Sequence, residues 1–300
     1  MLNIAFHPIY QLPLPLKHRF PMEKYDLLPK QLMHEGTCTP EDFFTPTALD
    51  RGTIERIHHS EYIDKLLALD LDKKEARKIG FPLSKELVER EIIIAGGTVQ
   101  GALKALQHGI AMNIAGGTHH AFRAHGEAFC LFNDQAIAAQ YLLDKKLVST
   151  ILIVDLDVHQ GNGTAEIFES NPDVFTFSMH GEKNYPFHKE NSDLDLALKD
   201  GCSDEVFLNI LQDTLPKLIT QNQPDFIFYL CGVDVLETDK LGRLGMSIAG
   251  CKQRDRYVLE LCEKHGIPVQ CSMGGGYSKD IKIIIEAHAN TFRVAKDVFD

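Results

Sequence analysis

The amino-acid sequence predicts an α/β protein in which helices flank a mostly parallel central sheet. From residue 110 onward, short apolar runs rich in β-branched residues alternate with amphipathic helical stretches, and this alternation is typical of parallel βα units. Polar or glycine-rich loops follow the apolar runs. No internal repeat, low-complexity segment or linker-like run divides the 300 residues, so we expect a single domain over residues 1–300.

The elements are predicted from the spacing of their apolar residues. An additional short apolar run lies at residues 2–6, and Ser60 and Ser84 suit the N-cap positions of two helices. The predicted strands are residues 111–115, 150–154, 174–178, 226–230 and 268–272. The predicted helices are residues 23–34, 53–69, 84–107, 134–143, 164–169, 204–219, 248–264 and 279–298.

Charge and composition argue against several functional classes. The formal net charge is −11, whereas a nonspecific nucleic-acid binder needs a basic footprint. An acidic field favours cationic substrates, although modest acidity also simply keeps a protein in solution. No apolar stretch approaches the roughly 20 residues of a membrane span, and the seven cysteines are scattered without a Cys-x-x-Cys pair. We therefore expect a soluble, cytoplasmic protein with reduced cysteines.

The loops after the five predicted strands hold most of the unusual residues. These loops begin after Ala115, Val154, Ser178, Leu230 and Ser272, and they contain histidine, aspartate, asparagine or runs of glycine. In open parallel sheets, ligands bind beyond the carboxyl ends of the strands. We therefore expect the five loops to meet at one edge of the sheet and to form a single active site.

The loop after the second of these strands predicts a metal site. Side chains alternate along an extended segment, so Asp155, Asp157 and His159 point to the same side. Two carboxylates and an imidazole in such a place favour a bound cation. Asp234 can supply a further ligand from a neighbouring loop. Three protein ligands with an open fourth position are typical of catalytic zinc, which lowers the pKa of bound water to about 7.

Two further features fit the hydrolysis of an amide. His119 and His120 follow the glycines of a turn, and such a pair could exchange protons with the attacking water and the leaving amine. Tyr277 follows three glycines, and its hydroxyl could stabilise an oxyanion opposite the metal. In isolation, the histidines would be interpreted as surface residues of a polar loop, and the glycine run as an ordinary turn.

These segments together resemble the zinc-dependent histone deacetylases, which have an arginase-like α/β fold. The Gln160-Gly-Asn-Gly variant is most similar to the class IV branch and its bacterial relatives, and His18-Arg-Phe-Pro-Met is similar to the bacterial branch. The matching segments occur in the family's order, over roughly residues 110–280. They are Ala115-Gly-Gly-Thr-His-His, Phe129-Cys-Leu-Phe-Asn-Asp, Asp155-Leu-Asp-Val-His-Gln-Gly-Asn-Gly, Gly232-Val-Asp-Val and Gly274-Gly-Gly-Tyr.

The resemblance implies a role for each matching residue. Asp157, His159 and Asp234 correspond to the ligands of one zinc ion per chain. His119 and His120 correspond to the tandem catalytic histidines, with His120 as general base and acid. Asp155 and Asn162 correspond to the residues that form hydrogen bonds with these two histidines, and Tyr277 corresponds to the residue that polarises the scissile carbonyl. Phe129 and Tyr185 resemble the aromatic walls of the acyl-lysine tunnel. The family also implies a structural potassium site near Asp155, Ser178 and Met179.

The sequence departs from the class I pattern at three places. Asn162 replaces an aspartate, so the partner of His120 is neutral and should raise the pKa of that histidine less. Gln160 replaces a second histidine. Residues 78–82 lack a counterpart of the loop aspartate that binds the substrate backbone, so the peptide specificity of class I does not carry over.

Two alternative functions stay open at this stage. A two-manganese ureohydrolase of the same broad fold would need additional carboxylates around a second metal. A non-catalytic module that binds acyl-lysine or acetyl-polyamine would be favoured by loss of Tyr277 or of a zinc ligand. Metal content per chain separates these alternatives. For an amidohydrolase, the sequence leaves an acylated protein lysine, a polyamine, a small amide and a longer acyl chain as open substrate classes, and it leaves the oligomeric state open.

Overall fold

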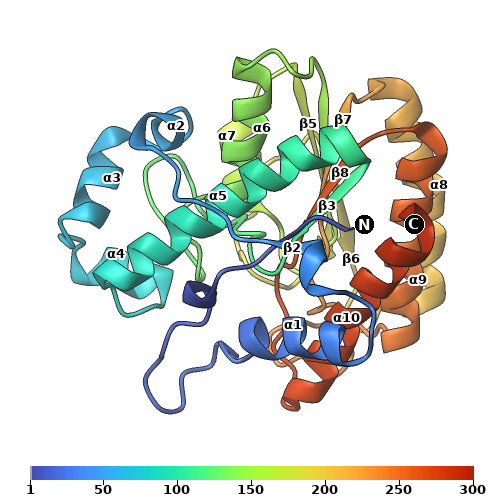
Figure 1. Cartoon of the computed structure of the whole chain (residues 1–300), viewed down its shortest axis with the longest axis horizontal. Helices are drawn as coiled ribbons and strands as arrows, with labels where there is room; N and C mark the ends of the chain where they lie inside the picture. The colour runs from blue at the N-terminus through green and yellow to red at the C-terminus, as the bar shows by residue number, and fades with distance from the viewer. Residues whose placement is uncertain (1) are drawn as a thin grey trace.

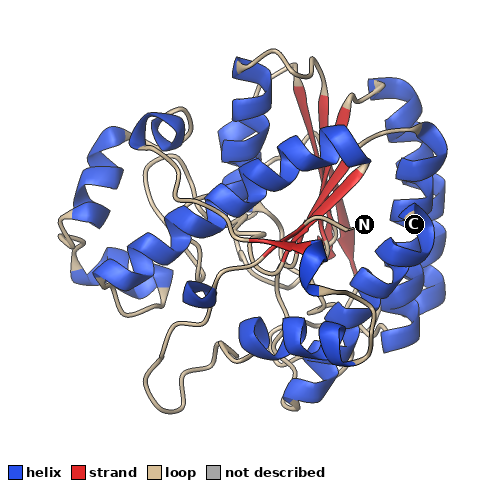
Figure 2. Ribbon diagram, viewed as in Figure 1, coloured by secondary structure: helices blue, strands red, loops and turns tan. Residues whose placement is uncertain are grey.

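A computed structural model describes residues 2–300, and its centre is one eight-stranded sheet (Figures 1 and 2). The strand order is β2-β1-β3-β8-β7-β4-β5-β6, and every neighbouring pair is parallel. The predicted α/β class with a mostly parallel sheet is therefore confirmed. The strands are β1 (Ile4–Ala5), β2 (Phe43–Phe44), β3 (Ile110–Asn113), β4 (Ile151–Asp155), β5 (Val174–Gly181), β6 (Leu194–Leu198), β7 (Phe226–Leu230) and β8 (Val269–Ser272).

Helices cover both faces of the sheet. Figure 2 shows α5, α6 and α7 on one side of the strands and α8, α9 and α10 on the other, with α1 packed beside α10. The larger helices are α1 (Lys24–His34), α5 (Lys85–His108), α6 (Asp134–Asp144), α8 (Asp204–Asn222), α9 (Ile248–His265) and α10 (Ile281–Phe299). The shorter ones are η1 (Pro8–Tyr10), η2 (Pro40–Asp42), α2 (Arg51–Glu55), α3 (Ser60–Leu67), α4 (Lys73–Ile79) and α7 (Asn162–Phe168).

The strand interiors are apolar because both faces of the sheet are covered. Every residue of β3, β4, β7 and β8 is buried, as expected for parallel strands between two helical layers. The edge strand β6 is different, because its residues are only half-buried or exposed apart from Leu198. The central strands β4 and β7 consequently read as nearly continuous apolar runs in the sequence, whereas β6 does not.

The helix predicted over residues 53–69 is wrong as a single element. It is two helices, α2 and α3, separated at residues 56–59. The break has a physical cause, because the residues there bond to a distant loop. The His59 N–H donates to the Arg123 carbonyl at 2.8 Å, and His58 Nδ1 lies 2.9 Å from the Phe122 carbonyl. Ser60 is the first residue of α3 and not its N-cap, whereas Ser84 caps α5 as predicted.

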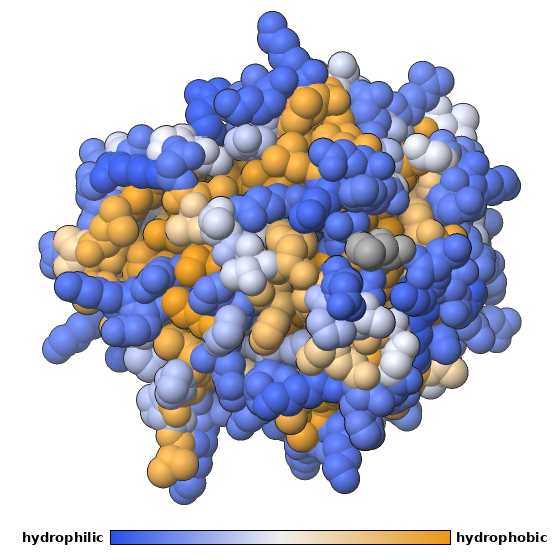
Figure 3. Space-filling model, in the orientation of Figure 1, coloured by the Kyte–Doolittle hydropathy of each residue, from blue (hydrophilic) through white to orange (hydrophobic). Residues whose placement is uncertain are grey.

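One loop stands out from the compact body of the molecule. Residues 11–23 project beside α1 (Figure 1), and hydrophobic atoms gather at the tip of this projection (Figure 3). Leu16 in this loop is 98% exposed, and the same loop returns to the body at Arg19 and Phe20, which line a cavity at the carboxyl edge of the sheet. No helix within residues 2–300 is long and apolar enough to cross a membrane.

A fully buried ion pair joins α9 to the ends of two central strands. The Arg254 guanidinium donates to the backbone carbonyls of Leu156 at 3.2 Å and Gly232 at 2.7 Å, which follow β4 and β7. Its carboxylate partner is Asp255, at 2.8 Å. Asp255 also accepts hydrogen bonds from Tyr229 in β7 and Thr291 in α10, both at 2.6 Å. Arg254 thereby fixes the two loops that hold the candidate metal ligands.

Replacing Arg254 with methionine should destabilise the protein by about 3–5 kcal/mol, because it leaves the buried Asp255 carboxylate without its counter-charge. Urea unfolding followed by circular dichroism measures this loss. The matched control is Arg256→Met in the same helix, where the exposed pair with Asp297 should contribute no more than about 1 kcal/mol. Equal losses for the two variants would show that Arg254 is not a structural anchor.

Candidate metal centre

The predicted convergence of five loops is present at the carboxyl edge of the sheet. Strands β3, β8, β7, β4 and β5 are consecutive neighbours, so the loops that follow them lie side by side. Residues from all five loops, those after β3, β4, β5, β7 and β8, line one cavity. The order of strands in the sheet thus brings together segments that are up to about 160 residues apart in the chain.

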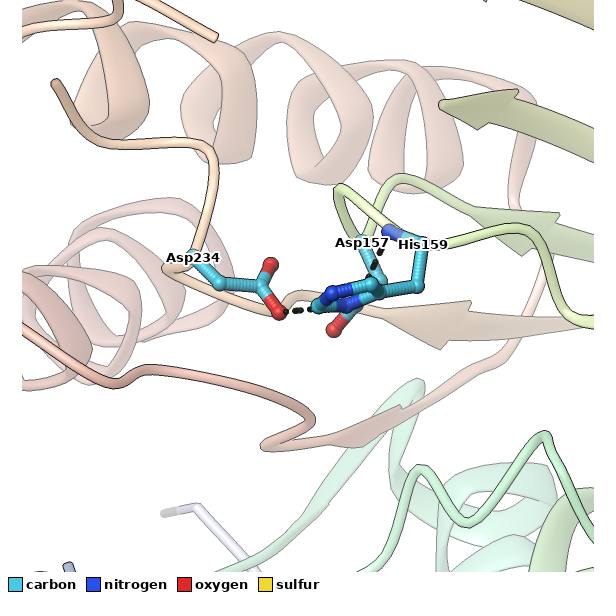
Figure 4. A group of neighbouring side chains, drawn as sticks. All are labelled: Asp157, His159 and Asp234. Carbon is cyan, nitrogen blue, oxygen red and sulfur yellow. Dashed lines mark hydrogen bonds and ion pairs between the residues drawn. The ribbon is translucent and has the colours of Figure 1, made fainter. Parts of the chain in front are cut away.

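Asp157, His159 and Asp234 form a compact buried group at this edge (Figure 4). Their potential ligand atoms all lie within 4.8 Å of one another. His159 Nδ1 is 3.0 Å from Asp157 Oδ1 and 3.1 Å from Asp234 Oδ2. Figure 4 shows the three side chains pointing toward one another from the loops after β4 and β7. The three predicted ligands are therefore placed as one donor set.

The electrostatics of this group suit a cation. Burial and the neighbouring Asp157 carboxylate together raise the pKa of Asp234 to about 7, which reflects the cost of holding two negative charges together. Burial disfavours a charged His159, but hydrogen bonds to Asp157 and Asp234 raise its pKa to about 10. The two carboxylates thus attract positive charge strongly. Oxygen and nitrogen donors in this number match the ligand set of a catalytic zinc ion.

Two glycines allow the carboxylates to approach the backbone. A Cβ atom on Gly232 would lie 2.2 Å from Asp157 Oδ2, and one on Gly275 would lie 2.0 Å from Asp234 Oδ2. Any side chain at either position would therefore displace a candidate ligand. The Gly275 N–H also donates to Asp157 Oδ2 at 2.9 Å, and the Val158 N–H donates to Asp234 Oδ1 at 3.0 Å.

His119 and His120 lie against each other beside the metal group, with ring centroids 4.1 Å apart. Their Nδ1 atoms point to different partners, at 2.6 Å each: His119 to Asp155 and His120 to Asn162. Burial opposes a charged His119, but Asp155 raises its pKa above the ordinary value. Burial and the neighbouring histidines lower the pKa of His120 well below that value. His120 is therefore the neutral member of the pair, with Nε2 left to accept a proton.

The turn that carries both histidines is held by Asp134. Its carboxylate accepts hydrogen bonds from the N–H groups of Gly117 and Thr118, both at 2.9 Å. The hydroxyls of Thr98 in α5 and Ser272 in β8 donate to the same carboxylate at 2.6 and 3.1 Å. Asp134 therefore ties the turn to a helix and a strand. Asp134 ends one of the segments that resemble the family, but an acidic residue at the start of a helix is ordinarily a capping group. Its role in holding the turn therefore becomes visible only in the structure.

Tyr277 lines the same cavity and follows the glycine turn. Its N–H donates to Asp239 at 2.6 Å, and the turn is also fixed by Lys24, whose ammonium donates to the Gly274 carbonyl at 3.0 Å. Burial and the charges of Asp234 and Asp157 raise the pKa of the Tyr277 hydroxyl well above its ordinary value. The hydroxyl stays protonated and can donate a hydrogen bond within the cavity.

The cavity has a volume of about 460 Å³ and an aromatic wall. Phe129 and Tyr185 both line it, and the Tyr185 ring stands edge-on to His120 at 5.0 Å. Sequence reasoning missed Phe20 and Phe81, whose rings each lie about 5 Å from Phe129. They come from segments before residue 110. Phe20 lies in the His18-Arg-Phe-Pro-Met segment, but neither residue follows one of the predicted strands. Aromatic rings and the candidate metal ligands Asp157 and His159 therefore line the same cavity.

Comparison with known proteins places the chain near one family. A model of the histone deacetylase domain matches residues 18–292. A protein of Picosynechococcus sp., named only as uncharacterized, is 45% identical over 296 residues, which cover 99% of each chain. Histone deacetylase 2 of Arabidopsis thaliana is 26% identical over 287 residues, which cover 92% of this chain and 74% of that protein. A crystal structure of an HDAC homolog complexed with SAHA has a similar fold, with a TM-score of 0.85 and 24% identity over 99% of this chain and 84% of that chain.

Replacing Asp157 or Asp234 with alanine should abolish stoichiometric zinc binding, because two remaining donors cannot complete a tetrahedral site. Elemental analysis of the purified protein should find about one zinc per chain in the parent and almost none in either variant. The control is Asp213→Ala on the exposed side of α8, which should keep its zinc. Full zinc retention in the Asp234 variant would refute the ligand assignment.

Proposed function

Because the chain belongs to the histone deacetylase family, we propose that this deacetylase-type hydrolase cleaves an acylated amine with one zinc ion held by Asp157, His159 and Asp234. The observation that carries the proposal is the juxtaposition of this buried donor set with a neutral histidine and a protonated tyrosine around one cavity. Bound zinc would polarise the acyl carbonyl and lower the pKa of a water molecule. The remaining chemistry belongs to the side chains of the chain itself.

His120 is the proposed general base and acid. Its Nδ1–H donates to Asn162 at 2.6 Å, and this contact leaves the lone pair of Nε2 for the attacking water. After attack, the same nitrogen can return the proton to the departing amine. His119 carries positive charge more readily because of Asp155. A positive His119 beside the reacting carbonyl would stabilise the negative charge that develops there.

Tyr277 is the proposed donor to the carbonyl oxygen. A hydroxyl that stays protonated can strengthen its hydrogen bond as the oxygen gains negative charge. The aromatic rings around the cavity would hold the acyl chain and its linker, and they would keep bulk water away from the reacting atoms. The bound SAHA in the related crystal structure supports an extended acyl-lysine-like group as the occupant. A structural potassium ion near Asp155, Ser178 and Met179 stays a prediction from the family resemblance.

The two alternative functions make different demands on the site. Within residues 2–300, one group of three or more close metal-binding side chains is found, which favours one zinc over a pair of manganese ions. A module that only binds acyl-lysine does not require a neutral general base next to a hydroxyl donor, whereas a hydrolase does. One zinc per chain together with turnover of an acyl-lysine peptide would separate the proposal from both alternatives.

Tyr277→Phe should lower kcat by about 10²–10³, because it removes one donor to the developing oxyanion. The ring remains, so folding, zinc content and binding of SAHA should survive. Tyr141→Phe on α6 is the matched control, since Tyr141 is partly exposed and does not line the cavity. Steady-state kinetics with an acyl-lysine peptide measure the effect, and near-normal turnover by Tyr277→Phe would contradict its assigned role.

Asn162→Asp should move the acidic limb of the kcat/KM profile to higher pH by about one unit or more. The added negative charge next to His120 stabilises the imidazolium and so raises the pKa of that histidine. Because the base must be neutral, activity is then lost at a higher pH on the acidic side. The profile of zinc-loaded enzyme measures the shift. An unmoved acidic limb would mean that a group other than His120 controls it.

A further inference from the structure

The cavity carries a charge opposite to that of the whole chain. The chain has a formal net charge of −11, yet the cavity described above is lined by six basic side chains and, among residues 2–300, by a single carboxylate. That carboxylate is Asp157, which belongs to the candidate metal group. The basic residues are Arg19, Lys78, Arg90, Lys183, Lys240 and Arg243. Arg90 is buried and paired with Glu91, and the other five are exposed.

Neighbouring carboxylates neutralise only part of the positive charge of these five exposed residues. Lys78 is matched by Glu127 at 2.7 Å. Lys183 and Arg243 share one carboxylate, Asp200, at 3.7 and 3.1 Å, so one positive charge of that trio is left over.

The last two exposed cations at the mouth, Arg19 and Lys240, are unmatched. Neither forms an ion pair with any carboxylate of residues 2–300. Arg19 lies instead over the ring of Phe129, 4.8 Å from its centroid. The mouth of the cavity therefore has an excess of positive charge.

These cations come from separate parts of the fold. Arg19 lies in the projecting loop before α1, and Lys78 is in α4. Lys183 lies in the loop after β5, and Lys240 and Arg243 lie in the loop after β7. Four segments therefore place positive charge around one opening. Because these side chains are exposed, they would face the part of a substrate that stays outside the cavity. The contact of Arg19 with the Phe129 ring fixes one of these charges directly at the aromatic wall.

We propose that the substrate carries a carboxylate or a comparable anionic group close to its acylated amine, which the exposed cations Arg19, Lys183, Lys240 and Arg243 recognise. The inference rests on the proposed deacylase function, because it concerns the same cavity. Opposite charge at the opening increases the local concentration of an anionic substrate and its rate of association. The same field disfavours acetylated polyamines and acyl-lysines in basic peptides, whose ammonium groups would lie near the same cations.

The preference is measured with three acyl-lysine peptides of equal length whose flanking residues are glutamate, glutamine or lysine. At low salt, kcat/KM of zinc-loaded enzyme should be about tenfold higher for the glutamate peptide than for the glutamine peptide, and lowest for the lysine peptide. At about 1 M salt the differences should shrink, because the Debye length falls to about 3 Å. Free Nε-acyl-lysine, compared with its α-amide, shows whether a small molecule with one carboxylate is preferred in the same way as an acidic peptide.

Charge-reversing substitutions test which cations at the opening recognise the anionic group. Lys240→Glu combined with Arg243→Glu should lower the ratio of glutamate-peptide to glutamine-peptide kcat/KM about tenfold, and Lys240→Glu alone should lower it less. Lys217→Glu is the matched control, because it changes the net charge by the same amount as Lys240→Glu from an exposed position on α8 that does not line the cavity. This control should keep the parent ratio. Circular dichroism verifies that each variant is folded.

The outcomes separate this inference from the proposed function. Equal turnover of the three peptides, a preference for the lysine peptide, or an equal change of the ratio in Lys217→Glu would overturn the anionic substrate class while leaving the deacylase proposal intact. If none of the peptides is hydrolysed, the deacylase proposal fails. Calorimetric titration of the peptides then decides the inference by itself, because tightest binding of the glutamate peptide supports it and equal binding overturns it.

Discussion

Two buried carboxylates, Asp157 and Asp234, have to be held within a few ångströms of each other at the end of the sheet, and much of the surrounding structure serves this purpose. Like charges in a poorly solvated place repel each other and lose hydration. The repulsion is offset by backbone N–H groups and by the imidazole of His159. Glycines at positions 232 and 275 leave the space that the carboxylate oxygens occupy. The ligand group therefore constrains the backbone of the loops after β4, β7 and β8.

The loops after β4 and β7 are also held by the Arg254 guanidinium. Its hydrogen bonds reach carbonyl groups next to both carboxylates, so a positive charge lies on the side of the loops away from the cavity. Asp255 extends this contact into β7 and α10. The sheet, the helical layer and the loops that carry the candidate metal ligands are therefore linked by one buried polar network. Such a network is stable only when every member has its partner, so the core of the fold and the geometry of the site depend on each other.

The sequence predicted the buried centre of the fold well and its periphery less well. Strand β7 begins and ends at the predicted residues, because both of its faces are covered and it reads as a continuous apolar run. Strand β6 at the sheet edge was missed because it is short and lacks a continuous apolar run: its leucines alternate with Asp195 and Ala197, and only Leu198 is buried. Two-residue β2 and the short helix α4 offer too few positions for a periodic pattern. The break between α2 and α3 depends on contacts with a loop about 65 residues away, which no local pattern contains.

The site divides in a similar way, because the residues in loops after predicted strands could be identified from the sequence, whereas the contacts that support them could not. Asp157, His159, Asp234 and Tyr277 lie directly after strands, where local sequence signals their position. Asp134 and Arg254 act through contacts that span 16 to 138 residues, and the basic mouth is assembled from four segments. Total charge could not indicate it either. At physiological ionic strength the Debye length is about 8 Å, so distant surface carboxylates are screened from the cavity. The net charge of the chain therefore says little about the cavity, and the few cations around the opening set the local charge there.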